Sequence, residues 1–122
     1  MPFSAIPPDA PVHEVKAELF KVLGHPVRVR VLELLADGEV PVAALLADTG
    51  LEPSHLSLHL GVLRRGGLVV ARREGNAVHY RLAHASVVAL LTAARSFLVD
   101  ALAGTRATLA DLERPDQEAG AR

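Results

Sequence analysis

The sequence predicts a mainly α-helical fold with one small β-hairpin, and three observations support this fold class. Apolar residues recur three and four positions apart over most of the chain, which is typical of amphipathic helices. Residues 68–82 instead have β-favouring side chains on both sides of a turn-forming tip at residues 72–76. Only four side chains are aromatic, so leucine, valine and alanine must form most of the core.

Length and composition place the chain among small soluble proteins. A chain of 122 residues has the size of a single domain with a modest core. Cysteine is absent, which excludes disulfides, thiolate metal sites and thiol redox switches. No apolar run approaches the roughly 20 residues of a membrane span, and the N-terminus lacks the pattern of a signal peptide. We therefore expect a cytoplasmic protein that does not enter a membrane.

Proline and glycine delimit the first elements. Residues 1–11 contain four prolines and are expected to form a flexible arm. A helical pattern starts at Val12 and stops at Gly24, and Pro26 suits the first turn of a second helix at residues 26–36. In this second helix the expected buried residues are Val27, Val31, Leu34 and Leu35, and the expected exposed residues are Arg28, Arg30 and Glu33.

Two further helices are joined by a short turn. A helix at about residues 42–48 ends at Thr49 and Gly50, and the next helix begins at Pro53. Its apolar seam is Leu56, Leu60 and Leu63, whereas Ser54, Leu58, Gly61 and Arg65 lie opposite, with His55 and Ser57 on the flanks. Two helices joined by a glycine-containing turn, the second with a polar outward face, form a helix-turn-helix arrangement. Residues 68–82 would add a wing to it.

The positive charge of the chain is concentrated in this helix and hairpin. Residues 53–82 carry five arginines and one glutamate, a formal charge of +4, while the whole chain carries −1. Such a local excess predicts contact with double-stranded DNA. Expected contacts to base edges come from Ser54, His55, Ser57 and Leu58, and contacts to phosphates or the minor groove from Arg72, Arg73 and Asn76. Further expected DNA-binding residues are Arg64, Arg65 and His79, and also His59, for which a structural role is an equal alternative.

The last helical stretch, residues 85–113, is so apolar and so long that one small subunit cannot bury all of its apolar side chains. Pro115 would end it, and residues 114–122 are expected to be a disordered tail, so the folded domain would comprise residues 12–113. We expect a homodimer, because readers of two-fold symmetric DNA present two recognition helices. The expected dimer interface consists of Val15, Leu19, Leu23, Leu91, Ala94, Phe97, Leu98, Ala101 and Leu102.

Three segments resemble motifs of the ArsR/SmtB family of bacterial winged-helix repressors. LGHPVRVRVLELL, residues 23–35, resembles the second helix of that family, and PSHLSLHLGVLRRGGLV, residues 53–69, resembles its recognition helix. ARREGNAVHYRL, residues 71–82, resembles its wing. The resemblance covers about residues 12–113. It implies four helices, a two-stranded hairpin and a fifth helix in a homodimer that occupies an inverted-repeat operator and releases it on a signal.

The resemblance also implies two positions for metal sites, and both lack ligands here. The thiolate site of the family falls on residues 40–45, where Pro41 and Ala43 replace the cysteines. The site of its last helix falls on His84, Ser86, Phe97 and Asp100, of which two could ligate. We therefore expect no metal and no cofactor, and the effector stays unknown. A non-standard site formed by His13, His84 and Asp100 near the dimer seam remains the alternative.

Two other function classes were weighed. A winged-helix module for binding another protein would use the exposed Leu58, Val62 and the wing. An enzyme is not expected, because the chain has no cysteine nucleophile, no glycine-rich phosphate loop and no convincing Ser-His-Asp set. The dependence of affinity on salt distinguishes the protein-binding module from DNA binding. DNA affinity should fall steeply with rising salt, because arginine contacts with phosphates release counterions, whereas an apolar protein interface should hardly respond.

Overall fold

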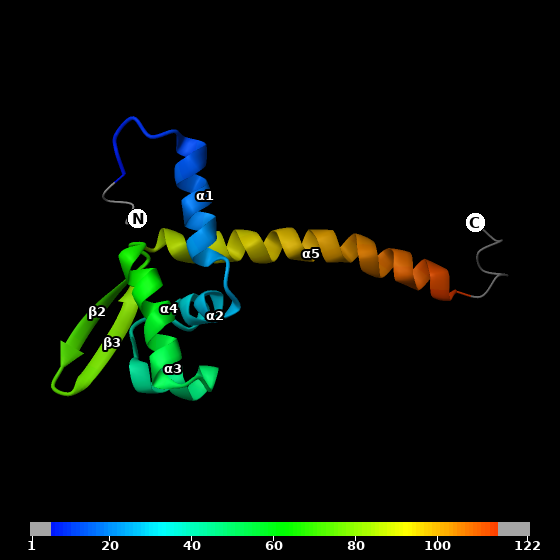
Figure 1. The fold of residues 1–122 in the computed structure, drawn as a ribbon. Helices are drawn as coiled ribbons and strands as arrows, with labels where there is room; N and C mark the ends of the chain where they lie inside the picture. Colours follow the sequence, from blue (N-terminus) through cyan, green and yellow to red (C-terminus); the bar gives the residue numbers. More distant parts are fainter. Residues whose placement is uncertain (1–5, 115–122) are drawn as a thin grey trace. The chain divides into compact units, whose positions relative to one another are not determined.

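The computed structural model describes residues 6–114 and contains, within them, five helices and three strands (Figure 1). In chain order they are α1 (Val12–Leu23), α2 (Pro26–Leu34), β1 (Val40–Pro41), α3 (Val42–Thr49), α4 (Pro53–Arg65), β2 (Val69–Glu74), β3 (Ala77–Leu82) and α5 (Ser86–Glu113). The mainly helical fold with a hairpin is as predicted. Of the expected arm and tail, residues 1–5 and 115–122 lie outside the described residues. The chain forms two compact units, one ending at Val88 and the other beginning at Ala89.

Local sequence explains where the helices start and stop. His25 caps the start of α2, because its Nδ1 accepts a hydrogen bond from the backbone N–H of Val27 at 3.1 Å, and Pro26 follows it. Gly50 ends α3 with a φ of 67°, a left-handed conformation that suits glycine. The five predicted helices are therefore confirmed, although α2 ends at Leu34 rather than near residue 36.

The core of the first unit lies between α2, α3, α4 and the sheet. The predicted seam of α4 is confirmed, because Leu56, Leu60 and Leu63 are each at most 3% exposed. The other buried apolar residues are Val31, Leu32, Leu35, Leu45, Leu68, Val69, Tyr80 and Val87. Leu32, which the helical pattern did not select, is fully buried, so α2 contributes a wider apolar face than predicted.

Several side chains lie elsewhere than the sequence predicted. Val27 and Leu34 are half-buried, as is Arg28, which was expected to be exposed. Gly61 was assigned to the outward face of α4 but is buried. The side chain of Arg65 covers it, since a Cβ at Gly61 would lie 3.0 Å from Nη1 of Arg65. Helical periodicity predicts only the direction of each position and not which neighbouring side chain folds over it.

The sheet has a third strand that the sequence analysis did not predict. Its strand order is β1-β3-β2, and β1 pairs antiparallel with β3 through Val40 opposite Tyr80 and Pro41 opposite His79. Two residues are too few to produce an alternating hydrophobic pattern, so β1 has no signal in the sequence. The strand anchors the loop after α2 to the hairpin.

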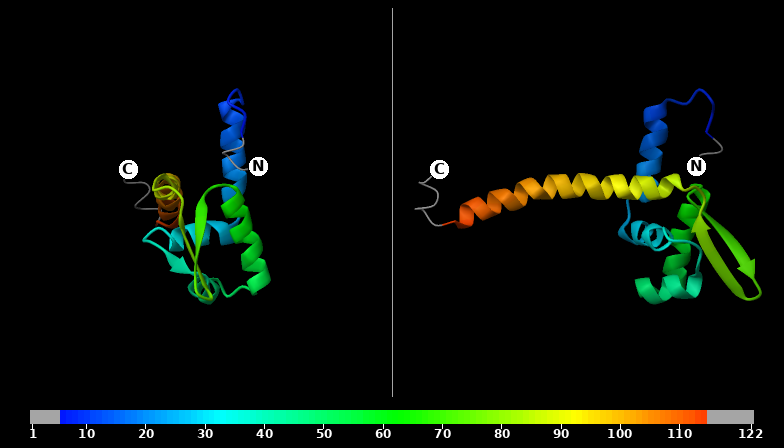
Figure 2. Two further views of the ribbon diagram at one scale, coloured as in Figure 1. Left: turned by 90° about the vertical axis from the view of Figure 1, so that its left-hand side faces the viewer. Right: turned by 180° about the vertical axis from the view of Figure 1, so that it is seen from behind.

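The hairpin turn is shorter than predicted. Glu74 pairs with Ala77, so Gly75 and Asn76 alone form the turn, and Gly75 has a φ of 60°. The expected tip at residues 72–76 was wrong, because Arg72, Arg73 and Glu74 all belong to β2. Strand alternation therefore separates the two arginines, which point to opposite faces of the hairpin. The turn and the N-terminal end of α4 lie at the same end of the unit (Figure 2).

Arg28 joins three helices, which explains its burial. Its Nε donates to the carbonyl of Val22 at 2.6 Å, and its Nη2 donates to the carbonyl of Lys21 at 3.3 Å. The first of these bonds satisfies a carbonyl at the end of α1 that has no helical partner, whereas the carbonyl of Lys21 also accepts from the N–H of Gly24. Its Nη1 lies 3.4 Å from Nδ1 of His59 on α4, and the His59 ring lies 4.2 Å from that of His25. Because arginine only donates, Nδ1 must accept, which requires neutral His59.

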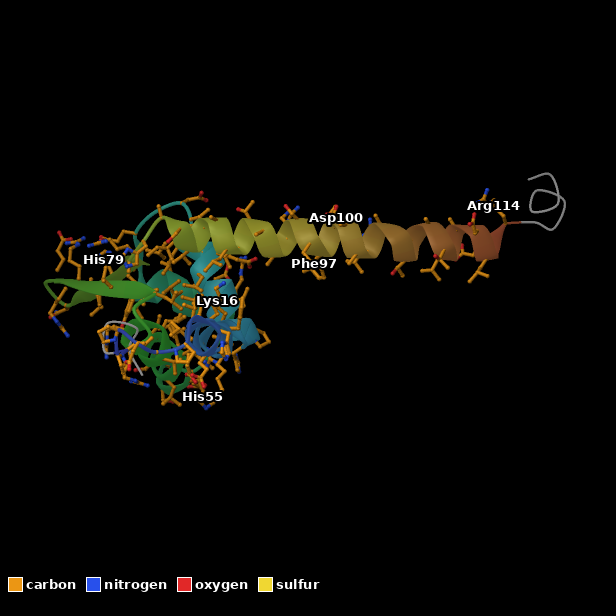
Figure 3. The ribbon with its side chains drawn as sticks, turned by 90° about the horizontal axis from the view of Figure 1, so that it is seen from above. Lys16, His55, His79, Phe97, Asp100 and Arg114 are labelled. Atoms are coloured by element: carbon orange, nitrogen blue, oxygen red, sulfur yellow. The ribbon has the colours of Figure 1, made fainter. Side chains whose placement is uncertain are left out.

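The second unit is the main part of α5. Beyond Leu91 every described side chain of this helix is exposed, including Phe97 at 70% and Leu112 at 77%. Figure 3 shows the side chains around Phe97 and Asp100 standing out from the helix. By length and composition alone α5 could cross a membrane, with a mean hydropathy of 1.6 over 18 residues, although the sequence analysis expected no such segment. However, Arg95 and Asp100 lie near its middle, and such charges cost about 2.5–3.5 kcal/mol each at the centre of a bilayer.

We expect the free energy of unfolding to decrease as the pH falls below about 6.5, the ordinary pKa of histidine. Burial, followed by the charges of His25, Arg28 and His55, lowers the pKa of His59 in the folded protein. The unfolded chain therefore binds this proton first as the pH falls. The stabilising contribution is complete above the unfolded pKa and is lost as the pH falls through the lower folded one. Urea unfolding at several pH values and fixed protein concentration measures it.

His59→Gln should flatten this pH dependence. His13→Gln, at the exposed start of α1, is the matched control and should leave it unchanged. If the pH dependence persisted in His59→Gln, the contacts of His59 with Arg28 and His25 would not be its cause.

Candidate nucleic-acid interface

The first two turns of α4 present a small polar surface opposite the buried seam. Ser54, His55 and Ser57 are exposed, and Leu58 is 67% exposed although it is apolar. Arg65 lies seven positions after Leu58 and therefore on the same side of the helix. Hydroxyl and imidazole groups can bond to base edges, and an exposed leucine can contact a thymine methyl group. The geometry of this surface agrees with the predicted base-contacting residues, whose contacts themselves remain a prediction.

His59 lies at the border of this surface rather than on it. The residue is half-buried, one ring nitrogen faces Arg28, and the ring stacks obliquely on His25 at an interplanar angle of 41°. Of the two roles weighed for His59, these contacts favour the structural one.

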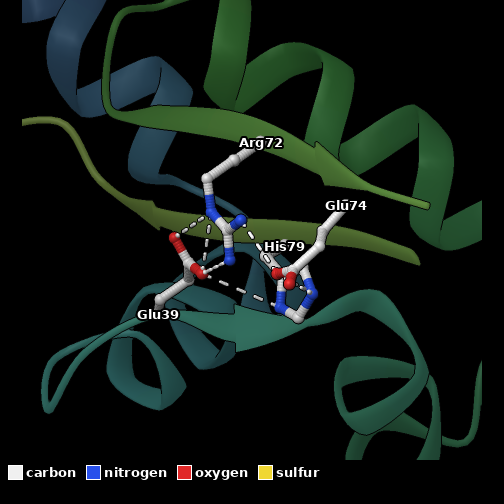
Figure 4. A network of polar contacts seen from close by, with 4 residues as sticks. All are labelled: Glu39, Arg72, Glu74 and His79. Atoms are coloured by element: carbon white, nitrogen blue, oxygen red, sulfur yellow. Dashed lines mark hydrogen bonds and ion pairs between the residues drawn. The ribbon is translucent and has the colours of Figure 1, made fainter. Parts of the chain in front are cut away.

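The outer face of the hairpin carries a cluster of four polar side chains: Glu39, Arg72, Glu74 and His79 (Figure 4). Nε of Arg72 donates to both carboxylate oxygens of Glu39 at 3.2 Å, and Nη2 donates to Oε1 of Glu39 at 2.5 Å. Nη1 donates to Glu74 at 2.9 Å. The bond from Arg72 lowers the pKa of Glu39, and both carboxylates raise the pKa of Arg72. We call this group the wing cluster.

His79 belongs to the wing cluster, and the sequence analysis had assigned it to the DNA-facing side. Its Nδ1 lies 3.8 Å from Glu39 and its Nε2 lies 4.0 Å from Glu74. Figure 3 places His79 on the hairpin, well separated from His55 on α4. Glu39 was not among the predicted residues, because it is 33 residues from Arg72 and no local pattern connects the two. Glu74 could have been found, since residues two apart share a face of a strand.

The remaining predicted DNA-binding residues lie free of that cluster. Arg73 is exposed on the opposite face of β2 and has no ion pair among residues 6–114. Asn76 is exposed in the hairpin turn, and Arg64 is exposed in the last turn of α4. These side chains are available to phosphates without breaking an existing contact.

The predicted dimer residues are placed in both units. On α1, Val15, Leu19 and Leu23 are half-buried, and Leu91 on α5 is half-buried as well. The other members of the set are exposed on α5: Ala94, Phe97, Leu98, Ala101 and Leu102. An apolar row of this kind is available to another helix.

The residues at the two family metal positions do not assemble a ligand set within one chain. Across the described part of the sequence, no group of three histidine, aspartate or glutamate side chains is close enough to hold a metal ion. His13 and His84 are both exposed, and Asp100 lies in the second unit. The alternative site of these three residues remains a prediction.

Comparison with known proteins identifies the family. The sequence profile of the helix-turn-helix domain matches residues 23–72. The HTH-type transcriptional regulator Rv0081 of Mycobacterium tuberculosis is 50% identical over 103 residues, which cover 84% of this chain and 90% of that protein. Its crystal structure superposes with a TM-score of 0.73 at 48% identity and covers 80% of this chain and 98% of that one.

Two further relatives agree. The biofilm growth-associated repressor of Xylella fastidiosa is 40% identical over 77 residues, 63% of this chain and 68% of that protein. A solution structure from Mycobacterium bovis is described as a homodimeric winged helix-turn-helix DNA-binding domain of a possible ArsR-family regulator. It matches with a TM-score of 0.66 at 35% identity over 73% of this chain and 82% of that one. The chain belongs to the ArsR/SmtB family of winged helix-turn-helix transcriptional regulators.

Proposed function

We propose that this protein is a transcriptional repressor that binds an inverted-repeat DNA operator as a homodimer. The observation that carries the proposal is α4, whose leucine seam is buried while its opposite face presents serine, histidine and leucine beside a basic hairpin. The description of the M. bovis relative as a homodimeric DNA-binding domain supports it. Such a protein acts by binding rather than by catalysis, in the compartment that holds the chromosome, and we propose the cytoplasm.

Base contacts and phosphate contacts would come from different residues. In this proposal Ser54, His55, Ser57 and Leu58 approach base edges in the major groove, because they form the exposed side of the first turns of α4. Arg64, Arg65, Arg73 and Asn76 approach phosphates or the minor groove, which position the protein without reading the sequence. His79 would approach DNA only from the outer face of the hairpin.

Dimerisation would use the apolar residues of α1 and α5. Burying an apolar side chain of this size stabilises an association by about 1.5–3 kcal/mol. A pair of recognition helices must also lie about one duplex turn apart, roughly 34 Å. A dimer therefore accounts both for the exposed apolar row of α5 and for recognition of an inverted repeat.

The signal that releases DNA would not be a metal bound at the positions used by the family. Pro41 and Ala43 offer no thiolate, and Phe97 offers no donor at all. A small organic molecule, a protein partner and competition at the promoter remain the candidate signals.

We expect Ser57→Ala to weaken binding to the operator while leaving binding to random duplex DNA unchanged. A bidentate contact between a side chain and a base contributes about 1–3 kcal/mol of discrimination, and a single hydroxyl contact should contribute less. Arg73→Ala should instead weaken both and reduce the dependence of log affinity on log salt by about 0.9, the value for one phosphate contact. Fluorescence anisotropy over a salt series, with an operator selected from genomic fragments, measures both effects.

Ser96→Ala, on α5, is the control and should match the unaltered protein. If Arg73→Ala leaves both the affinity and the salt dependence unchanged, the hairpin does not contact the DNA backbone. Binding of a partner protein through Leu58, with an affinity that does not change with salt, would favour the alternative of a protein-interaction module.

We expect Leu98→Glu to convert the homodimer into monomers that bind the operator poorly. A charge buried at an apolar interface is strongly unfavourable unless it is paired. Multi-angle light scattering at micromolar concentration measures the oligomeric state. Ser96→Glu, two positions away and on the other side of α5, should remain dimeric. The proposal fails if the unaltered protein is a monodisperse monomer, and a requirement for detergent would favour a membrane location for α5.

We expect zinc or nickel, titrated into the operator complex, to change the affinity by no more than a few-fold. A metal releases DNA only if it binds the free protein more tightly than the complex, and two scattered ligands provide little affinity. Stoichiometric zinc binding coupled to a tenfold loss of operator affinity, about 1.4 kcal/mol, would contradict this expectation. Loss of that effect in His84→Ala or Asp100→Ala would then identify the non-standard site.

A further inference from the structure

Arg72 is the arginine of the hairpin whose guanidinium is already bound to carboxylates. Each of its three guanidinium nitrogens donates to a carboxylate, two to Glu39 and one to Glu74. Arg73, its neighbour in the sequence, has no such partner in the described part of the chain. The two arginines are equivalent in the sequence but differ in their availability to DNA.

The topology of the sheet creates this difference. Glu39 directly precedes β1 at one edge of the sheet, whereas Arg72 lies on β2 at the other edge. His79 of the middle strand pairs with Pro41 on one side and with Arg72 on the other. The side chain of Arg72 therefore extends across β3, over His79, to reach Glu39 (Figure 4). Arg73 projects to the opposite face, where no carboxylate of residues 6–114 forms an ion pair with it.

The carboxylate of Glu39 occupies Arg72 in the way that a phosphate would. Both anions accept two parallel N–H bonds from a guanidinium. With Glu74 also bound, the guanidinium has two negative partners, which neutralise its positive charge. The side chains are about half and one-third exposed, and such ion pairs at a surface are weak enough for a phosphate to displace the carboxylate.

We propose that Glu39 is a positioning residue that competes with DNA phosphates for Arg72 and so limits the sequence-independent affinity of the protein for DNA. This inference rests on the proposed function and extends it. Glu39 contacts no base and acts only through the arginine. The hairpin would thus have one arginine, Arg72, that becomes available only when its carboxylate partner is displaced, whereas Arg73 and Arg81 form no ion pair with a carboxylate among residues 6–114.

A double-mutant cycle on a long random-sequence DNA duplex tests the proposal. Glu39→Gln should increase the affinity about two- to fivefold at low salt. It should also steepen the dependence of log affinity on log salt by up to about 0.9, equivalent to one added phosphate contact. In an Arg72→Ala background, Glu39→Gln should have no larger effect than Glu52→Gln, because the arginine for which Glu39 competes is then absent. Thermal unfolding checks that each variant is folded.

Glu52→Gln is the matched control for loss of a negative charge. Glu52 is exposed directly before α4, and its side chain makes no capping bond. A change in affinity from this substitution should persist in the Arg72→Ala background. The proposal is overturned if Glu39→Gln weakens DNA binding, which would make the Glu39–Arg72 contact a requirement for it. It is also overturned if the full gain persists without Arg72, which would make the effect one of net charge.

A measurement without DNA keeps the inference separate from the proposed function. In the free protein, the Nε–H proton of Arg72 should exchange with solvent more slowly than that of Arg73, and Glu39→Gln should remove the difference. If the unaltered protein bound no duplex at any salt concentration, the proposed function would fail while this NMR measurement still tested the contact. Equal exchange rates for the two arginines would refute the contact itself.

Discussion

Burial of the leucine seam of α4 is the constraint on which the rest of the first unit depends. Leu56, Leu60 and Leu63 pack into the core with α2, α3 and the sheet, and this packing determines the rotation of α4 about its own axis. Once the seam is buried, Ser54, Ser57 and Leu58 on the other side of the first turns face solvent. The polar surface of the helix is therefore a consequence of core packing. A substitution in the buried seam would disturb DNA recognition by rotating or displacing α4, although it changes no residue of the polar surface.

Polar contacts between elements then determine how each charged side chain is used. Arg28 donates to carbonyls at the end of α1 and reaches His59 on α4, so one guanidinium links the first helix, the start of the second and the helix proposed to read DNA. Arg72 plays a similar part between the two edges of the sheet. The positive charge counted from the sequence is thus not all freely available to a ligand, because part of it is bound to carbonyl and carboxylate oxygens of the protein itself.

The second unit poses a different physical problem. A single helix with an exposed apolar row is unfavourable in water, since helices of this kind gain most of their stability from packing rather than from intrinsic propensity. Pairing with a second copy is the arrangement that also provides two recognition helices. The charges at Arg95 and Asp100 make a membrane the less favourable environment for the same row.

Much of this protein follows from the sequence alone. Proline and glycine mark the helix ends, and the spacing of Leu56, Leu60 and Leu63 determines which side of α4 is buried. These signals are local, since each depends on residues within a few positions of one another. The family motifs are equally local, and the comparisons agree with the resemblance they suggested.

Only the tertiary structure decided which functional side chains are bound within the protein and which remain exposed to a ligand. The strand β1 is too short to leave a pattern, yet it brings Glu39 to Arg72 across 33 positions of sequence. Arg72 and Arg73 belong to β2 rather than to the turn, so strand alternation sends them to opposite faces. Arg28 and Gly61 are covered by neighbours that periodicity does not describe. In each case the deciding contact joins residues that only packing brings together, so a local sequence pattern cannot predict it.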